Sequence, residues 1–321
     1  MPPAPKSLPL VFCFAGQGSQ YYHMAADLLA EEPVFRQWMD IGDAIVRDRH
    51  AFSPLAEIHA SGRRASGPFD RLEHTHPAIF MTQFAMAKLL QHKGIRPDML
   101  LGVSLGEFAA MSVAGMVPFE TALAAVARQP RLFLESCAPG ALIAVLGPPS
   151  LRESEPRLGT LSELAGINAE RHHVLAMPGE NAAEVEAILT RLDAPFQRLP
   201  VPFAFHSRWI EPARTGVVAD AASERLESPF WPVWSACLSA PVQPGVADLA
   251  WRIVREPMRL GATVAAIEAQ GGAHYIDLSA TSSLAAIIRQ DLGEASRSRI
   301  SAVLSPFGGN LRRLAKLLET A

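Results

Sequence analysis

The chain has 321 residues, of which 49% are hydrophobic and 19% charged, which are proportions typical of one large folded domain or two modest ones. A formal net charge of −3 argues against nucleic acid as a partner, and no apolar stretch is long enough to cross a membrane. The widely separated cysteines predict neither a metal site nor a disulfide framework, so a reducing, cytoplasmic setting is expected; they are Cys13, Cys137 and Cys237.

The first elements alternate between a strand and helices. Residues 1–7 are rich in proline, have no apolar signal core and are expected to be disordered. Leu8 to Phe14 is an apolar run typical of a buried parallel strand. Gly16 and Gly18 then permit a sharp turn and a close approach to a ligand, although an ordinary strand-to-helix turn has the same pattern. Helical patterns follow at 21–31, 33–49 and 78–93, the last of them directly after His76-Pro77.

The stretch from Met99 to Ala110 predicts a strand, an abrupt turn and a helix. Gly102, Ser104 and Gly106 form the G-x-S-x-G pattern of a nucleophile elbow, in which a strained turn lifts a serine hydroxyl above the sheet. A simple glycine-flanked turn is the alternative. In the catalytic interpretation, the N–H that follows the serine begins a helix and points to where an oxyanion would form.

In residues 139–198 the order of predicted strands and helices differs from that in the rest of the chain. The patterns predict strands at 141–146, 174–177 and 196–201, with helices at 150–165 and 180–192. Two inserted strand–helix units indicate a small α+β subdomain with its own sheet. A helix from about residue 118 precedes this insert. Strands at 233–236 and 274–278 return to the main sheet, and a helix at 309–319 ends the pattern.

A serine hydroxyl needs a neighbouring base, and His206 is the candidate that stands out among ten histidines. It lies in the short apolar run 201–207, where a buried structural histidine is the alternative. The only aspartate between Ser104 and His206 is Asp193, which falls in the insert and is poorly placed for a triad. A Ser–His dyad, whose imidazole is oriented by a backbone carbonyl, fits these residues better.

Taken together, three motifs resemble the malonyl-CoA:acyl-carrier-protein transacylase family of fatty-acid and polyketide synthesis. They are Gly16-Gln17-Gly18-Ser19-Gln20, Gly102-Val103-Ser104-Leu105-Gly106-Glu107 and Phe203-Ala204-Phe205-His206-Ser207. Their order and spacing match over about residues 10–320. The resemblance implies an α/β fold: a large α/β-hydrolase-like domain with a parallel sheet, at 8–138 and 199–321, and an inserted ferredoxin-like subdomain at 139–198.

The resemblance also implies roles for individual residues. Ser104 would be the nucleophile and His206 the general base. The backbone N–H groups of Gln17 and Leu105 would form the oxyanion hole, and a carbonyl near Ile253 would orient the histidine. No metal or other cofactor is expected, because the acyl group arrives on the phosphopantetheine of a carrier protein or on CoA.

One departure from the family concerns the acyl pocket. In malonyl-specific members an arginine grips the free carboxylate, but the matching position here is Gln129. On a helix, Arg128 and Arg131 are rotated by about 100° and 200° from that direction, so neither would replace it unless Pro130 kinks the helix. The pocket is expected to involve Gln129, His76, Val103, Phe203 and Phe205.

An uncharged position 129 favours acyl groups without a free carboxylate. The leading hypothesis is a stand-alone acyl hydrolase that clears non-malonyl acyl groups from acyl carrier protein in polyketide biosynthesis. One alternative is an acyltransferase that moves malonyl or another acyl unit from CoA to the carrier. Another, of a different class, is an inactive module that docks carrier protein.

Overall fold

The structure of the protein is a computed structural model, which describes residues 8–221, 225–293 and 296–320. The expected disorder of residues 1–7 therefore falls outside the described residues. A six-stranded sheet forms the main body, with strand order β10-β9-β1-β2-β7-β8. All neighbours pair in parallel except β7 and β8. The strands are β1 (Leu10–Phe14), β2 (Met99–Gly102), β7 (Val233–Ser235), β8 (Ala240–Pro241), β9 (His274–Asp277) and β10 (Arg299–Ala302).

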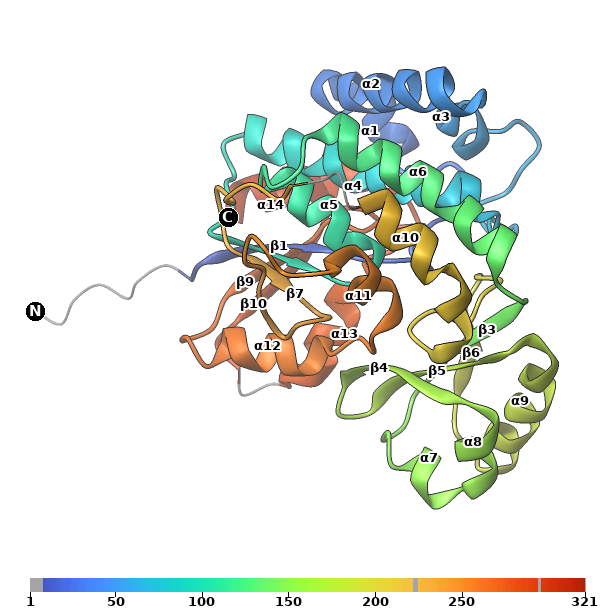
Figure 1. Ribbon diagram of the computed structural model, residues 1–321. Coiled ribbons are helices and arrows are strands. Elements are labelled where there is room, and N and C mark those ends of the chain that lie inside the picture. Colours follow the sequence, from blue (N-terminus) through green and yellow to red (C-terminus); the bar gives the residue numbers. More distant parts are fainter. Residues whose placement is uncertain (1–7, 222–224, 294–295, 321) are drawn as a thin grey trace, which may run out of the picture.

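Side chains alternate between the two faces of this sheet, and both faces are buried. Phe12 and Phe14 join the core on one face, while Val11 and Cys13 join the core on the other. Helices on the first face include α4, α5 and α6, and α12 and α13 lie on the opposite side (Figure 1). The first core draws on α1 (Ala26–Glu31), α2 (Pro33–His50), α3 (Pro54–Ile58), α4 (Leu72–His92), α5 (Leu105–Val113), α6 (Phe119–Ser136) and α14 (Asn310–Thr320).

The second core is completed by helices from the later part of the chain. These are η2 (Arg208–Ala213), a 3-10 helix, with α10 (Arg214–Ala221), α11 (Leu249–Arg255), α12 (Leu260–Glu268) and α13 (Ser283–Leu292). Among the described residues, no helix is long and apolar enough to cross a membrane.

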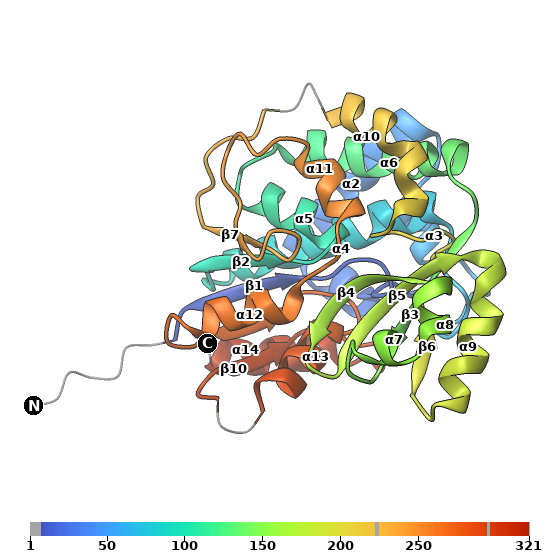
Figure 2. The ribbon, with the colours of Figure 1, turned by 60° about the horizontal axis from the view of Figure 1, so that its bottom comes forward.

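A second sheet of four antiparallel strands, in the order β4-β5-β3-β6, is built from residues 140–198. With helices after its first and third strands, it has the β-α-β-β-α-β order of a ferredoxin-like unit. It lies beside the main body, at the carboxyl ends of β1 and β2 (Figure 2). Its elements are β3 (Gly140–Val145), α7 (Leu151–Ser154), α8 (Pro156–Leu161), β4 (Glu163–Ala169), β5 (His172–Pro178), η1 (Gly179–Asn181), α9 (Ala182–Arg191) and β6 (Phe196–Arg198).

The two faces of this small sheet have different neighbours. Ile143 and Val145 pack against α8 and α9 in a core of their own. Leu142 and Val174 point the other way and join the core of the main body. The small sheet therefore presents one apolar face to the main sheet, and that face forms a wall of the site.

Several expectations from the sequence were wrong in detail. The helix expected at 150–165 breaks at Pro156, and β4 begins at Glu163. β4 depends on pairing with β5, which a local pattern does not reveal. β10 was likewise not expected, and among the described strands it pairs with β9 alone. Helix α4 begins at Leu72, six residues before the expected start, and includes Pro77. Burial of 16 of the 21 residues of α4 outweighs the hydrogen bond that the proline cannot donate.

Candidate active site

Ser104 stands at the turn between β2 and α5. Its φ of 53° and ψ of −126° place it in a strained backbone conformation that non-glycine residues rarely adopt. The two flanking glycines are required by close packing. A Cβ on Gly102 would lie 2.5 Å from the Cα of Glu107, and one on Gly106 would lie 2.1 Å from the carbonyl oxygen of Phe14. This packing holds the turn in place and raises the serine above the end of the sheet.

His206 completes a hydrogen-bonded chain with the serine. Its Nε2 lies 2.9 Å from Oγ of Ser104, and its Nδ1 lies 2.9 Å from the carbonyl oxygen of Glu256. A carbonyl oxygen only accepts hydrogen bonds, so Nδ1 carries the proton and Nε2 is free to accept from the serine hydroxyl. A further bond, from the backbone N–H of His206 to Val254, anchors the residue in its left-handed conformation, with φ of 61°.

The expectation that Ile253 supplies the orienting carbonyl was wrong. Ile253 lies inside α11, which ends at Arg255. Glu256 follows with an extended backbone, φ −78° and ψ 150°, so its carbonyl is turned out of the helical direction and reaches the imidazole. A carbonyl does orient His206, but it belongs to the residue just past the helix.

Burial lowers the pKa of His206 to about 4, with the Glu256 hydrogen bond acting in the opposite direction. The imidazole is therefore neutral at pH 7 and able to take a proton. His76, another histidine of the site, is buried too, and desolvation lowers its pKa to about 3. Neither ring brings positive charge to the site at neutral pH.

The loop after β1 lies directly against the serine. A Cβ on Gly16 would lie 2.9 Å from Cβ of Ser104, so only glycine permits this approach. Gln17 and Leu105 both border the cavity at the serine, from the loop and from the first position of α5. The N–H at that first position is one that a helix leaves unpaired.

Gln83 on α4 holds this loop in place and was missed by the sequence analysis. Its side-chain oxygen accepts from the N–H of Ala15 at 2.6 Å, and its nitrogen donates to the carbonyl of the same residue at 2.9 Å. The local pattern carries no sign of this role, because Gln83 is simply one polar residue in an apolar helix.

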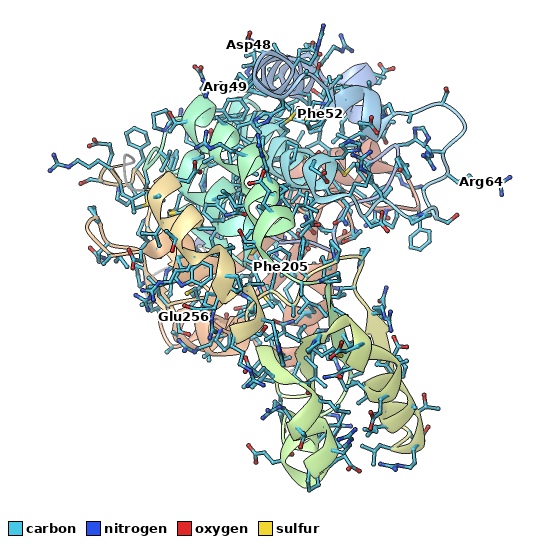
Figure 3. The ribbon with its side chains drawn as sticks, turned by 45° about the vertical axis from the view of Figure 1, so that its right-hand side comes forward. Asp48, Arg49, Phe52, Arg64, Phe205 and Glu256 are labelled. Atoms are coloured by element: carbon cyan, nitrogen blue, oxygen red, sulfur yellow. The ribbon has the colours of Figure 1, made fainter. Side chains whose placement is uncertain are left out.

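The serine opens into a cavity of about 240 Å³ between the main body and the small sheet, here called the serine cavity. Four of the five residues expected around the acyl group line it: Gln129, His76, Val103 and Phe205. The fifth, Phe203, is buried behind them, where its ring packs against Phe133 and Phe205. Phe205 lies where the main body meets the small sheet (Figure 3). The small sheet adds residues that were not anticipated, among them Leu142, Asn168 and His172.

Comparison with known proteins matches almost the whole chain to one family. The profile described as "Acyl transferase domain" matches residues 11–318. The chain is 39% identical to the polyketide biosynthesis acyltransferase homolog BaeD of Bacillus velezensis, over 93% of this chain and 92% of that protein. It is 37% identical to the homolog PksD of Bacillus subtilis, over 95% and 94%. The chain belongs to the acyl transferase family.

Solved structures agree with this assignment. The loading acyltransferase of the avermectin polyketide synthase superposes with a TM-score of 0.88 at 24% identity, over 97% of this chain and 98% of that one, which shows the fold. The MCAT of Streptococcus pneumoniae superposes with a TM-score of 0.81 at 25% identity, over 97% and 100%. The fold class expected from the sequence is confirmed, and the chain is an enzyme of a family that acts on acyl thioesters.

The serine cavity of this acyltransferase-family chain has no lysine or arginine among the described residues that line it. Arg128 pairs with Asp220 on α10, and Arg131 pairs with Glu135 near the solvent. Neither arginine is among the described residues that line the serine cavity. Gln129 itself is only 7% exposed, lines the serine cavity and carries no charge.

In this member of the acyl transferase family, hydrogen bonds of Glu107 connect the turn at Ser104 to β7. Its carboxyl accepts from the hydroxyl of Ser235 at 2.5 Å and from the backbone N–H of Cys237 at 3.0 Å. Desolvation raises the pKa of Glu107 to about 8, although these hydrogen bonds act to lower it. Glu107 is thus largely protonated at pH 7 and serves as a neutral link between α5 and β7. Its place in the motif after Ser104 gives no sign of this role, because the partners of Glu107 lie far away in the sequence.

We expect Glu107→Gln to alter the pH dependence of stability. A folded pKa near 8, above the usual 4.5, means that the folded wild type binds more protons between those two values. Its free energy of unfolding therefore falls as pH rises from about 5 to 8. The neutral glutamine removes this dependence, so the variant should gain relative stability over that interval, by up to a few kcal/mol.

Denaturant unfolding at pH 5, 6, 7 and 8 measures this difference. Parallel stability curves for the two proteins would contradict the raised pKa. The variant Glu135→Gln serves as a control, because that carboxylate lies near the solvent in an exposed ion pair and should give nearly parallel curves.

Proposed function

We propose that the protein is an acyl hydrolase of polyketide biosynthesis, which cleaves non-malonyl acyl thioesters from acyl carrier protein. The absence of any cation around Gln129, within the described lining of the serine cavity, is the observation that carries this proposal. A malonyl carboxylate buried there would have no charged partner, which costs about 3–5 kcal/mol. Acetyl, propionyl and longer acyl groups avoid this penalty. The acyl group comes on a phosphopantetheine arm, so the protein needs no cofactor of its own.

The first half-reaction forms an acyl-enzyme. Oγ of Ser104 attacks the thioester carbonyl carbon while Nε2 of His206 takes the hydroxyl proton, and Nδ1–H remains bonded to the carbonyl of Glu256. The N–H groups of Gln17 and Leu105 stabilise the negative oxygen. The C–S bond then breaks, and the imidazolium returns its proton to the leaving thiolate. The products are an ester on Ser104 and the free thiol of the carrier.

The second half-reaction consumes water. A water molecule gives a proton to Nε2 of His206 as its oxygen attacks the ester carbonyl. The C–O bond to Ser104 breaks, and the serine oxygen recovers the proton. The carboxylic acid leaves, and the dyad returns to its starting state. If a carrier thiol replaced the water, the same steps would transfer the acyl group instead.

Acyl transfer from CoA to a carrier protein is the second candidate, favoured by the names of the relatives, which are called acyltransferase homologs. Incubation with radiolabelled acetyl-, butyryl- and malonyl-CoA plus carrier protein, and in parallel with preloaded carriers, separates the two. Free labelled acid from acetyl and butyryl carriers supports hydrolysis. Label retained on the carrier supports transfer, and a preference for malonyl would overturn the proposal. A serine-directed probe that fails to label Ser104 would point to an inactive docking module.

We expect hydrolysis to lose its activity only at an unusually low pH. Because burial keeps the pKa of His206 near 4, the base stays neutral down to about pH 5, and kcat/KM should reach half its maximum near pH 4. Rate measurements from pH 3.5 to 8 test this, with activity reassayed at pH 7 to exclude unfolding. A fall of kcat/KM to half its maximum near pH 6.5 would contradict the prediction, because it would mean that water surrounds the imidazole.

We propose a cytoplasmic location, which the three free cysteines support, because thiols stay unpaired in a reducing compartment.

A further inference from the structure

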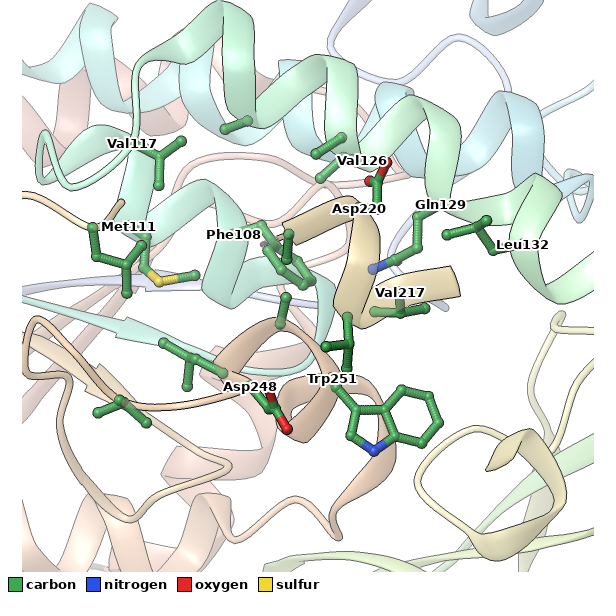
Figure 4. Close-up of a pocket in the computed structure, with 18 residues that line it drawn as sticks. Phe108, Met111, Val117, Val126, Gln129, Leu132, Val217, Asp220, Asp248 and Trp251 are labelled. Carbon is green, nitrogen blue, oxygen red and sulfur yellow. The ribbon is translucent and has the colours of Figure 1, made fainter. Parts of the chain in front are cut away.

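A second cavity adjoins the serine cavity, and Gln129 is the one residue that lines both of them within the described chain. We call it the tail cavity; its volume is about 230 Å³. It lies between α5, α6, α10 and α11, away from the small sheet. Figure 4 shows Gln129 with its amide end directed into this cavity, on the side of Phe108 and Val217.

The lining of the tail cavity is mainly hydrocarbon. It includes Phe108 and Met111 of α5, Val126 and Leu132 of α6, Val217 of α10 and Trp251 of α11. Two carboxylates, Asp220 and Asp248, also border it, and each is paired with an arginine outside the lining, Arg128 and Arg214. An uncharged apolar ligand fits such walls, whereas a carboxylate would meet two acids and no cation among the described lining residues.

We propose that the tail cavity receives the distal part of a medium-length acyl chain, whose carbonyl carbon sits at Ser104, and that the side chain of Gln129 moves aside to admit it. This inference rests on the proposed function and names its substrate class. An apolar cavity of about 150 Å³ holds benzene, so about 230 Å³ has room for roughly eight carbons. Unbranched acyl groups of about eight to ten carbons therefore fit, because only the distal part of such a chain lies in the tail cavity while its carbonyl end stays in the serine cavity.

A series of unbranched acyl thioesters of N-acetylcysteamine, from acetyl to decanoyl, tests the proposal on the full-length protein. Each methylene that leaves water for the cavity should raise kcat/KM about fourfold, so octanoyl should exceed butyryl by about 10². A flat series, or one that falls beyond butyryl, would overturn it.

Two variants that fill the tail cavity test directly whether the acyl chain enters it. Ala125→Leu adds bulk from α6, and Val217→Phe adds bulk from α10, so either suffices if the other fails to fold. Both should lower kcat/KM for octanoyl at least tenfold and leave acetyl within about twofold. The matched control is Thr121→Leu, which adds the same leucine to the same helix at an exposed position outside the cavity. Equal losses with acetyl and octanoyl would contradict a role for the cavity in chain binding.

The two proposals fail in different ways. If the wild type hydrolyses acetyl and butyryl thioesters with no gain from octanoyl, the tail cavity is not a chain site, and the proposed hydrolase stands. If malonyl is the preferred acyl group, the hydrolase proposal itself is wrong.

Discussion

We expect Ser104→Ala and His206→Ala each to lower kcat for acyl-thioester hydrolysis by about 10⁴ to 10⁶. The two groups act as one unit through the 2.9 Å hydrogen bond between Oγ and Nε2, so removal of either leaves no activated nucleophile. The double variant should therefore be about as slow as either single variant. Single-turnover hydrolysis of a butyryl carrier protein measures all three.

The control for this prediction is Ser112→Ala. Ser112 is a buried serine on α5, and its hydroxyl has no hydrogen-bond partner among the described residues. Its replacement should leave both the rate and the unfolding temperature near those of the wild type. Losses that multiplied in the double variant, or a Ser104→Ala protein that kept a tenth of the activity, would show that Ser104 and His206 do not work together.

Gln129→Arg should reverse the choice of acyl group. A guanidinium at this position would supply the partner that a malonyl carboxylate lacks, with two charge-assisted hydrogen bonds. We expect kcat/KM for malonyl thioesters to rise by about 10² to 10³, in proportion to the roughly 3–5 kcal/mol recovered. Octanoyl and butyryl should become poorer substrates, because the charge would then be stranded beside hydrocarbon. Acyl-enzyme masses after incubation with paired thioesters report the change directly.

Gln129→Met separates charge from shape in this experiment. It keeps the length of the side chain and adds no charge, so it should not gain malonyl activity. Arg131→Gln removes a cation from the same helix, at an exposed ion pair with Glu135, and should change nothing. A malonyl gain in the methionine variant would mean that the cavity selects by size and not by charge.

The two reactive residues can be predicted from the sequence, but the groups that hold them in position cannot. Ser104 lies in a motif whose glycines are needed locally, and His206 lies in an unusual apolar run, so both could be singled out without a structure. The orienting carbonyl was expected at Ile253, three residues before Glu256, which supplies it. The sequence does not show where α11 ends, and that end decides which carbonyl turns toward the ring. Gln83 escaped notice because its partner, Ala15, lies 68 positions away.

The chain by itself determined the elbow, the tight glycine loop, the apolar strands and the uncharged residue at position 129, because each depends on short-range sterics or on the identity of one side chain. Only the tertiary structure decided that β4 and β10 are strands, that Glu256 orients His206 and that Gln129 borders two cavities. These features arise where segments distant in the chain pack together. Strand pairing and cavity shape are properties of those contacts, and no local pattern of residues encodes them.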